Sequence, residues 1–507
     1  MASNVTSWQT IAAQPAEYGP MPVGLDPRLV EQLAAQGRQC PAQAIEHLYT
    51  HQSEAVRQAL DGRHLVVVTP AASGKTLCYN LPVLNALLRD PATRALYLFP
   101  TKALAHDQLE DLQSFAEALA LDATIAAYDG DTPQGRRAKI RQSAGVIVSN
   151  PDMLHVGILP YHTRWRGFFA NLRYVVIDEM HTYRGIFGSH VANVLRRLRR
   201  ICRFYGSDPQ FICCSATIAN PVELAQKLTG QPVSMISRNG APRGKRHLVF
   251  YNPPIINQRL GIRRSALLEA RTLANRLLNA DVQTVVFCRS RMAVEQLLIT
   301  LRQDARRTGR DPGAIRGYRG GYLATERREI EEGLRQGDVR GVVATNALEL
   351  GVDIGGLSAC IMAGYPGTIA STWQRAGRAG RGSDVSVAFL VASSSPLDQY
   401  IISHPSYFMG QSPEHALINP DNLHLLLDHV GCAAAELPFA NDESYGGEDV
   451  QAILGFLAKG GRVHKSRQRW YWAGGDQPAG GISLRTAEGD RVVIAAEQEG
   501  REYTVAD

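Results

Sequence analysis

The 507-residue chain has few features that would mark a metal-binding, disulfide-bonded or membrane protein. Its eight cysteines are scattered and form no C-x-x-C pair, so we expect neither a zinc site nor a disulfide framework. The N-terminal MASNVTSWQTIAAQPAEYGP has no basic region followed by an apolar run, which argues against a signal peptide. No apolar stretch reaches membrane-spanning length. We therefore expect a soluble, cytoplasmic protein in which Cys213 and Cys214 are buried strand residues.

The charge balance of the chain is nearly even. Lys and Arg number 54 against 48 Asp and Glu, which gives a net charge of +6 and a pI near 8.9. So small an excess is compatible with a polyanionic partner, yet many cytosolic enzymes carry a similar one. Any nucleic-acid role must therefore rest on local motifs.

Short apolar runs, each followed by an amphipathic stretch, recur along most of the chain. The first set is HLVVVT (64–69), ALYLFP (95–100), GVIVSN (145–150), YVVIDE (174–179) and FICCSAT (211–217), and the second is TVVFCRS (284–290), RGVVATN (340–346), SACIMAG (358–364) and VSVAFLVA (385–392). Unbroken runs of this kind are typical of parallel strands that are covered on both faces. The sequence thus predicts two α/β units in series with a cleft between two sheets.

The stretch HVANVLRRLRRICRFYG predicts an amphipathic helix. Its apolar residues at helical spacing are Val191, Val194, Leu195, Leu198 and Ile201. Its arginines, which fall mostly on the other sides, are Arg196, Arg197, Arg199, Arg200 and Arg203. We expect this arginine run to form a solvated helix face rather than a binding surface.

The stretch VVVTPAASGKTLCYN has the features of a phosphate-binding loop. Ser73, Gly74, Lys75 and Thr76 lie at a strand-to-helix transition, where free backbone N–H groups and the helix dipole favour a phosphate. Lys75 would reach the β- and γ-phosphates, and the Thr76 hydroxyl would ligate Mg²⁺. Thr69 stands where the G-x-x-x-x-G-K-[ST] pattern has its first glycine, so this loop variant should need no strained backbone there. A solvated Gly-Lys turn is the alternative.

Two further motifs support a nucleotide site. Asp178 and Glu179 end the apolar run YVVI, where Asp178 would hold Mg²⁺ and Glu179 would orient and deprotonate the attacking water. In QRAGRAGR, from the second α/β unit, Arg378 and Arg381 are candidates for stabilising the charge on a γ-phosphate across the cleft. Hydrolysis would then depend on closure of the two units. An acidic turn and a generic basic loop are the alternatives for the two motifs.

The order of HQSEAV, ASGKT, FPTKALAHDQ, DEMH, SAT, VVFCRS, ATNALELGVDIG and QRAGRAGR resembles a superfamily-two helicase with a DEAH-like box. LYTHQSEAV, DEMHTYRGIFGSHVANVLRRL, NGAPRG, YRGGYLATERREIE and SPEHALINPDNL are similar, more narrowly, to the MrfA/YprA-type DNA-repair helicases, relatives of the fungal RecQ-four-like helicase. The resemblance implies two RecA-like parallel-sheet domains in tandem and a C-terminal helical and winged-helix-like accessory segment. The implied division is an N-terminal extension (1–24), RecA-like domain 1 (25–237), a linker (238–255), RecA-like domain 2 (256–400) and the accessory region (401–507).

The resemblance also implies roles for individual residues. Gln52 would read the adenine edge, and Asp353 would contact the ribose. The implied nucleotide-binding set also holds Ala72, Ser73, Gly74, Lys75 and Thr76. Ser215 and Thr217 would couple the nucleotide to strand contacts, while Glu349 and Gln374 would line the shared cleft. The residues implied to hold the phosphates of a nucleic-acid strand are Thr101, Lys102, Asn150, Arg289 and Thr345. In isolation, Ser215 and Thr217 could also be strand caps, and Arg289 a solvated turn.

The expected function is an ATP- and Mg²⁺-dependent DNA helicase or translocase in DNA repair, which the resemblance implies to move 3′→5′. The alternatives are a motor that tracks RNA or duplex nucleic acid without separating strands, and a non-catalytic nucleic-acid-binding scaffold. DNA, single-stranded or as a tailed duplex, is the expected partner; RNA, a repair nuclease and a separate C-terminal module are further candidates. Family members carry a C-terminal cysteine cluster that binds zinc, and we expect this chain to lack that module. Trp470 and Trp472 could stack on bases, although a packed β-core is the stronger expectation.

Overall fold

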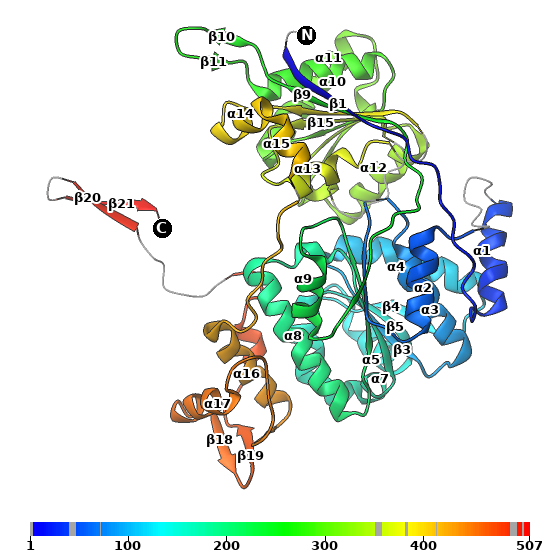
Figure 1. Cartoon of the computed structure of the whole chain (residues 1–507), viewed down its shortest axis with the longest axis vertical. Helices are drawn as coiled ribbons and strands as arrows, with labels where there is room; N and C mark the ends of the chain where they lie inside the picture. Colours follow the sequence, from blue (N-terminus) through cyan, green and yellow to red (C-terminus); the bar gives the residue numbers. More distant parts are fainter. Residues whose placement is uncertain are drawn as a thin grey trace.

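The computed structural model of the chain describes residues 4–39, 47–70, 72–349, 357–380, 384–411, 413–486, 494–498 and 501–506. Two seven-stranded sheets lie one beyond the other along the long axis of the molecule, each with helices around it (Figure 1). We call the part built on the sheet that begins with β2 lobe 1, and the part built on the other sheet lobe 2. Within the described ranges, no helix combines the length and apolar character that crossing a membrane requires.

Lobe 1 is built on a wholly parallel sheet with the strand order β4-β5-β3-β6-β7-β2-β8. The strands are β2 (Leu65–Val68), β3 (Arg94–Leu98), β4 (Thr124–Ala127), β5 (Ala144–Ser149), β6 (Leu172–Ile177), β7 (Gln210–Ser215) and β8 (Ser234–Ile236). All five predicted strands are present. The two that the sequence did not predict, β4 and β8, are the edges of the sheet, where partial exposure removes the continuous apolar run.

Helices cover both faces of this sheet. They are α1 (Pro27–Gln39), α2 (Thr50–Leu60), α3 (Thr76–Arg89), α4 (Lys102–Ala118), α5 (Gln134–Ser143), α6 (Pro151–Met153), α7 (Arg166–Ala170), α8 (Gly185–Phe204) and α9 (Pro221–Thr229), with short helical turns at Leu154–Ile158, Leu159–Trp165 and Met180–Thr182. Successive strand residues point to opposite faces, so Cys213 belongs to one hydrophobic core and Cys214 to the other. Both are fully buried, which confirms the prediction for these cysteines.

Lobe 2 has the strand order β1-β9-β16-β15-β12-β14-β13, with only β1 antiparallel. Its strands are β1 (Val5–Ile11), β9 (Arg246–Tyr251), β12 (Thr284–Phe287), β13 (Ile315–Tyr318), β14 (Gly341–Ala344), β15 (Ala359–Ala363) and β16 (Ser386–Val391). The four predicted strands are present. Strands β1 and β9 lie in the segments expected to be an N-terminal extension and a linker. Both belong to this sheet, since β1 pairs with β9 and β9 pairs with β16.

The helices of lobe 2 are α10 (Ala266–Asn279), α11 (Arg291–Arg307), α12 (Ala324–Gln336), α13 (Ile369–Ala376), α14 (Pro396–Ser403) and α15 (Pro405–Gly410). A hairpin of β10 (Ile255–Asn257) and β11 (Ile262–Arg263) projects beside them, and 3₁₀ turns lie at Pro312–Ala314 and Asn346–Leu348.

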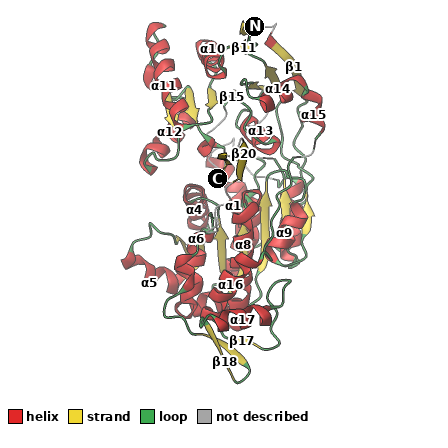
Figure 2. Cartoon of the chain, turned by 90° about the vertical axis from the view of Figure 1, so that its left-hand side faces the viewer, coloured by secondary structure: helices red, strands yellow, loops and turns green. Residues whose placement is uncertain are grey.

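Residues 419–486, which we call the accessory region from here on, pack on the end of lobe 1 that is remote from lobe 2 (Figures 1 and 2), whereas residues 401–410 pack on lobe 2. The accessory region contains α16 (Leu423–Glu436), α17 (Val450–Lys459), a turn at Pro478–Gly481 and an antiparallel sheet of β17 (Phe439–Ala440), β19 (Arg469–Trp472) and β18 (Val463–Ser466). A hairpin, β20 (Ile494–Gln498) with β21 (Arg501–Ala506), follows. Trp470 is buried and donates from Nε1 to Gln451 (2.9 Å), and Trp472 packs against the same core, which confirms the core interpretation of both tryptophans.

The surroundings of helix α8 differ from the prediction made for its arginines. Its apolar residues are buried as expected, but the expectation that its arginines form a solvated face is wrong. Arg197 is fully buried and paired with Glu436 of α16, while the Arg200 guanidinium lies 3.9 Å from the ring centre of Phe439 in β17. The accessory region covers this side of the helix, a partner that helical periodicity alone cannot reveal.

Candidate active site in the cleft between the lobes

The phosphate-binding loop joins β2 to α3 and turns through two left-handed residues. Ala72 has φ +61° and Gly74 has φ +76°, whereas Thr69 does not adopt a positive φ. The fully buried Thr69 hydroxyl lies 2.6 Å from the Ser73 hydroxyl and closes the loop from inside. The position that is usually glycine therefore needs no glycine here, as the sequence predicts for this loop variant.

The two functional side chains at the end of the loop are held by neighbouring polar groups. Lys75 Nζ donates to the backbone carbonyls of Thr69 (2.9 Å) and Pro70 (3.1 Å), so its ammonium lies across the mouth of the loop. Thr76 begins α3 and donates from its hydroxyl to Gln108 Oε1 (3.1 Å). Lys75 and Thr76, the residues predicted to bind phosphate and to ligate magnesium, therefore lie together at one helix N-terminus.

Helix α2 presses its first turn against this loop. Gln52 Nε2 donates to Gly74 O (2.9 Å), and Gln52 Oε1 accepts from Tyr49 N (3.0 Å). The φ of +76° at Gly74 favours glycine, and a Cβ there would also displace Gln52 Nε2, which would lie 2.6 Å away. Gln52, predicted to read adenine, thus also positions the loop.

His51 also contacts the phosphate-binding loop, and the sequence did not reveal this contact. Its Nδ1 accepts from Gly240 N (3.3 Å), so the ring proton is on Nε2, which lies 3.0 Å from Ser73 O. Burial lowers the pKa of His51 to about 4, which keeps the ring neutral in this arrangement. His51 begins the HQSEAV motif, of which only Gln52 was given a role from the sequence.

The acid pair follows β6 at the carboxyl edge of the sheet. Asp178 is buried and accepts from Tyr79 OH (3.0 Å) and from the Glu179 backbone N–H (2.7 Å). Burial, reinforced by the neighbouring Glu179, raises the pKa of Asp178 to about 7, and Lys75 acts in the opposite direction. Glu179 adopts a left-handed backbone (φ +48°, ψ +42°), which strains a residue with a Cβ and is often found at functional sites.

A hydrogen-bonding contact joins the two lobes beside this pair. His181, two residues beyond Glu179, accepts at Nδ1 from Ala216 N (3.2 Å), and its Nε2 lies 2.6 Å from the side-chain amide of Gln374 in α13. Burial lowers the pKa of His181. Gln374 therefore lies in the cleft between the lobes. His181 was not among the predicted site residues, although it ends the DEMH box.

The arginine-rich end of α13 also faces the cleft. Arg378 is buried and donates from Nη2 to Glu349 O (2.7 Å). Burial lowers the pKa of Arg378, and the nearby Glu179 and Glu349 offset part of this effect. The Glu349 carboxylate accepts from Arg375 Nε (2.8 Å). Arg375 is not among the predicted site residues. The other predicted finger, Arg381, lies outside the described residues, as does Asp353.

Several cavities lie between the lobes among the described residues. One of about 380 Å³ is lined by the phosphate loop, by Thr217, by α13, by Arg243 and by Arg246 at the start of β9. Another of about 310 Å³ is lined by His181, Glu349 and Gln374, among others. Thr217 is exposed to the first cavity. Ser215 is fully buried and donates to Ala216 O (2.7 Å), a local contact within the strand end.

The predicted strand-binding residues follow pairs of neighbouring strands. Thr101 and Asn150 follow β3 and β5, and Arg289 and Thr345 follow β12 and β14, so each pair meets at the carboxyl edge of its sheet. The side chains of Thr101, Asn150 and Thr345 each cap a helical turn by accepting a backbone N–H. Arg289 donates to Asp398 (2.6 Å).

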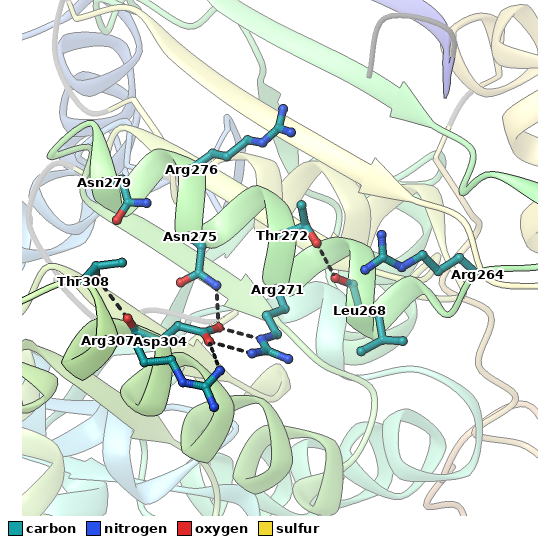
Figure 3. A pocket seen from close by; sticks show the side chains of 10 residues that line it. All are labelled: Arg264, Leu268, Arg271, Thr272, Asn275, Arg276, Asn279, Asp304, Arg307 and Thr308. Carbon is teal, nitrogen blue, oxygen red and sulfur yellow. Dashed lines mark hydrogen bonds and ion pairs between the residues drawn. The ribbon is translucent and has the colours of Figure 1, made fainter.

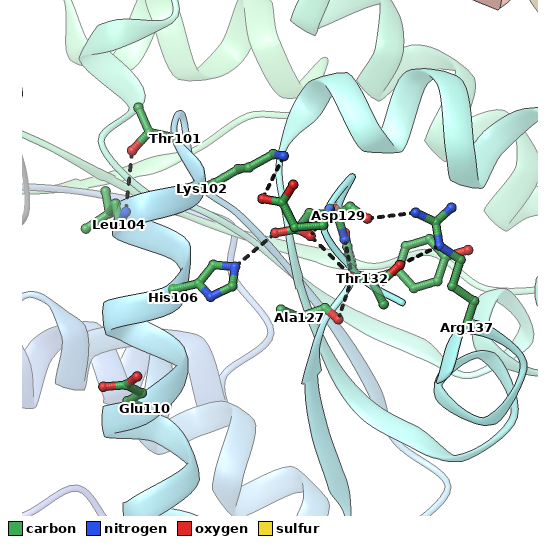
Figure 4. A network of polar contacts seen from close by, with 12 residues as sticks. Thr101, Lys102, Leu104, His106, Glu110, Ala127, Asp129, Thr132 and Arg137 are labelled. Carbon is green, nitrogen blue, oxygen red and sulfur yellow. Dashed lines mark hydrogen bonds and ion pairs between the residues drawn. The ribbon is translucent and has the colours of Figure 1, made fainter. Parts of the chain in front are cut away.

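Lys102 lies in a polar network on the same edge of lobe 1 (Figure 4). Its Nζ pairs with Asp131 at 2.9 Å, and both groups are exposed. His106, one turn along α4, bonds to Asp129 at 3.0 Å, and Asp129 also accepts from the backbone N–H of Asp131 at 2.9 Å. The Lys102 ammonium is therefore accessible, and among the described residues it pairs with the solvated Asp131 carboxylate.

A further cavity, of about 430 Å³, lies on α10 and α11 of lobe 2 (Figure 3). Four arginines line it together with Asp304, which pairs with Arg271 through both carboxylate oxygens at 2.6 Å. None of the predicted site residues lines this cavity, so it is no candidate for the nucleotide.

Comparisons with known proteins agree with this geometry. The family model described as DEAD/DEAH box helicase matches residues 49–225, the helicase conserved C-terminal domain matches 269–383, and the winged helix domain of the ATP-dependent helicase HRQ1 matches 418–487. The uncharacterized ATP-dependent helicase YprA of Bacillus subtilis is 53% identical over 98% of this chain. The crystal structure of the DUF1998 helicase MrfA bound to DNA and AMPPNP superposes with a TM-score of 0.91 at 52% identity, over 99% of this chain and 69% of that chain. The chain belongs to the MrfA/YprA-type superfamily-two helicases.

Family membership confirms the predicted fold class of two RecA-like domains followed by a winged helix domain. ATP-dependent helicase HRQ1 of Saccharomyces cerevisiae is a further relative, 38% identical over 92% of this chain. The chain spans 65% of the length of the Bacillus protein and 44% of the yeast protein.

Proposed function

We propose that this MrfA/YprA-type chain is an ATP-dependent DNA helicase or translocase that couples ATP hydrolysis to movement along a DNA strand in DNA repair. The observation that carries this proposal is the contact between Gln374 of lobe 2 and His181 of lobe 1, beside the acid pair and the phosphate loop. Because each lobe supplies a part of one site, the chemical step depends on closure of the cleft, and reopening of the cleft returns the lobes to their starting positions.

The residues present fit a nucleotide with Mg²⁺. The left-handed Gly74 and the N-terminus of α3 offer a phosphate cradle, and Lys75 lies at its mouth. Thr76 and Asp178 would hold the metal, which would neutralise negative charge on the phosphates. Glu179 would orient the attacking water and take its proton, and Arg378 and Arg381 would stabilise charge on the γ-phosphate.

The strand would lie along the carboxyl edges of the two sheets. There, Thr101, Lys102 and Asn150 of lobe 1 and Arg289 and Thr345 of lobe 2 would hold its phosphates. Contacts of this kind give little sequence preference and make binding sensitive to salt. DNA as the substrate is supported by the relative MrfA, whose crystal structure contains DNA. We propose 3′→5′ movement from the family resemblance.

The decisive experiment compares ATP hydrolysis by the wild type and by Glu179→Gln, with single-stranded DNA or RNA at matched salt. We expect DNA-stimulated hydrolysis that falls by more than about a hundredfold in the variant, since the base is removed while its shape is kept. Equal rates in the two proteins would contradict the enzymatic proposal and favour a non-catalytic scaffold. Stimulation by RNA but not by DNA would make RNA the substrate in place of DNA. Hydrolysis without unwinding of 3′- or 5′-tailed duplexes would indicate a translocase that does not separate strands.

A further inference from the structure

A short segment, residues 413–418, runs from lobe 2 to the accessory region across the cleft; we call it the strap. Its far end is fixed to lobe 1, because Ala416 and Ile418 are buried in the lobe 1 core. Asn220 of lobe 1 clamps Ala416 from both sides, accepting its backbone N–H at 2.8 Å and donating to its carbonyl at 3.4 Å. The strap is therefore a fixed part of the lobe 1 surface.

One side chain of the strap reaches the other lobe. The Glu414 carboxylate accepts the backbone N–H groups of Ile369 (2.5 Å) and Ala370 (3.1 Å), the first two residues of α13. The Glu414 backbone carbonyl accepts from Ala219 N of lobe 1 (3.4 Å), four residues beyond Ser215 in the loop that follows the SAT motif. A single residue thus contacts both lobes, by its side chain on one and by its backbone on the other.

The contact completes the N-terminal cap of α13. The first N–H groups of a helix have no partner within the helix, and a carboxylate is favoured there by the helix dipole. Thr368 accepts the third of them, from Ser371 (3.0 Å), and Glu414 accepts the first two. The N-terminus of α13 is therefore held by a charge that comes from outside its own lobe.

Helix α13 carries the groups that lobe 2 presents to the acid pair. Gln374, which meets His181, lies in this helix, and Arg378 follows directly after it. Glu414 lines the same cavity of about 310 Å³ as Gln374 and His181. A displacement of the strap would therefore move the start of the helix whose next turns complete the site.

We propose that Glu414 is a positioning residue: it ties α13 to the lobe 1 surface and so holds Gln374 where it meets His181. This inference rests on the proposed function, because it assigns a role in the same hydrolytic site. Loss of the carboxylate should leave nucleotide binding by the phosphate loop intact and impair the step that needs both lobes.

The kinetic test uses Glu414→Ala and Glu414→Gln, the second of which keeps one acceptor oxygen for α13. We expect kcat of DNA-stimulated ATP hydrolysis to fall by about tenfold to a hundredfold in Glu414→Ala and by less in Glu414→Gln, with KM for ATP within about threefold of wild type. The matched control is Glu448→Ala, an exposed glutamate of the accessory region, which should behave as wild type. A Glu414→Ala protein with wild-type kcat would overturn the inference.

Hydrogen exchange gives a readout that does not depend on activity. In Glu414→Ala, exchange should accelerate at the amides of Ile369 and Ala370 and also at Ala219 of lobe 1, because release of the side chain loosens the strap. Acceleration confined to α13 would reduce Glu414 to a local cap and overturn the tie between the lobes. Asn220→Ala, which weakens the strap from the lobe 1 side, should accelerate the same amides of α13. A wild-type protein without ATP hydrolysis would contradict the proposed function, whereas unchanged exchange in both variants would contradict only the tie.

Discussion

The buried pair of Arg197 and Glu436 offers a strong test of how the accessory region is held on lobe 1. Arg197 lies on α8 with its side chain fully buried, and the side chain of Glu436, at the end of α16, is 2% exposed. The Arg197 Nε lies 3.1 Å from each carboxylate oxygen, and Nη1 lies 2.7 Å from His155 Nδ1. Both charges are satisfied only by each other and by their close neighbours, so removal of either leaves an uncompensated charge in the interior.

We expect Arg197→Met to destabilise the protein by about 3–5 kcal/mol, and Glu436→Gln by a similar amount. The double variant Arg197→Met/Glu436→Leu should lose less than either single variant, because no buried charge remains and the apolar side chains fill similar volumes. Arg203→Met, an exposed arginine on the same helix, is the matched control and should change stability by less than about 0.5 kcal/mol.

Urea unfolding followed by tryptophan fluorescence measures these differences, since Trp470 and Trp472 report on the accessory region. With a urea dependence of about 1–3 kcal/mol per molar, a loss of 3–5 kcal/mol lowers the midpoint by about 1 M or more. A midpoint for Arg197→Met within about 0.3 M of Arg203→Met would refute the reasoning. So would a double variant less stable than both single ones.

Three further changes test other parts of the structure. Burial, followed by repulsion from Arg197, lowers the pKa of His155 to about 3, so the unfolded chain binds a proton below about pH 6.5 that the folded chain does not. This group alone should lower stability by about 2 kcal/mol from pH 7 to pH 5, so in urea titrations His155→Gln should lose about 2 kcal/mol less than the wild type over that range. Lys102→Ala should weaken binding to single-stranded DNA in fluorescence titrations and reduce the slope of log K against log salt concentration by about one. Asp131→Asn, which frees the Lys102 ammonium, should tighten binding. A change in the same direction for both variants would contradict a phosphate contact by Lys102. Gln374→Ala should lower kcat of DNA-stimulated hydrolysis by about tenfold or more with nucleotide affinity within about threefold, and an unchanged kcat would show that the contact with lobe 1 has no part in the reaction.

The central strands of both sheets could be predicted from sequence, because each is buried on both faces and leaves an unbroken apolar run. The edges could not. β4 and β8 are short and partly exposed, and β1 pairs with β9 across more than two hundred residues of chain. The Gly, Pro and Arg content before β9 indicates a linker, and only the partner strands show that part of the segment is sheet.

The site shows the same division between local and distant information. The loop around Lys75, the pair Asp178 and Glu179, and Gln374 could be placed from sequence, because each motif has its own spacing and its own position at the end of a strand or in a helix. His51 and His181 lie one and two residues from predicted site residues and were still missed. Their roles depend on Gly240 and on Gln374, which contact them from distant parts of the chain.

The contacts that sequence could not predict are those by which the parts of the molecule hold one another. Arg197 is one of several arginines on a helix, and only Glu436 makes it an interior charge. Glu414 is an ordinary acid in a coil, and only the start of α13 makes it a cap. In both cases one charged residue satisfies groups on an element far away in the chain, and a charge of this kind is stable only while the two elements stay together. If hydrolysis depends on the relative placement of the lobes, such residues set that placement, and substitutions at them should alter turnover or domain docking while every motif remains intact.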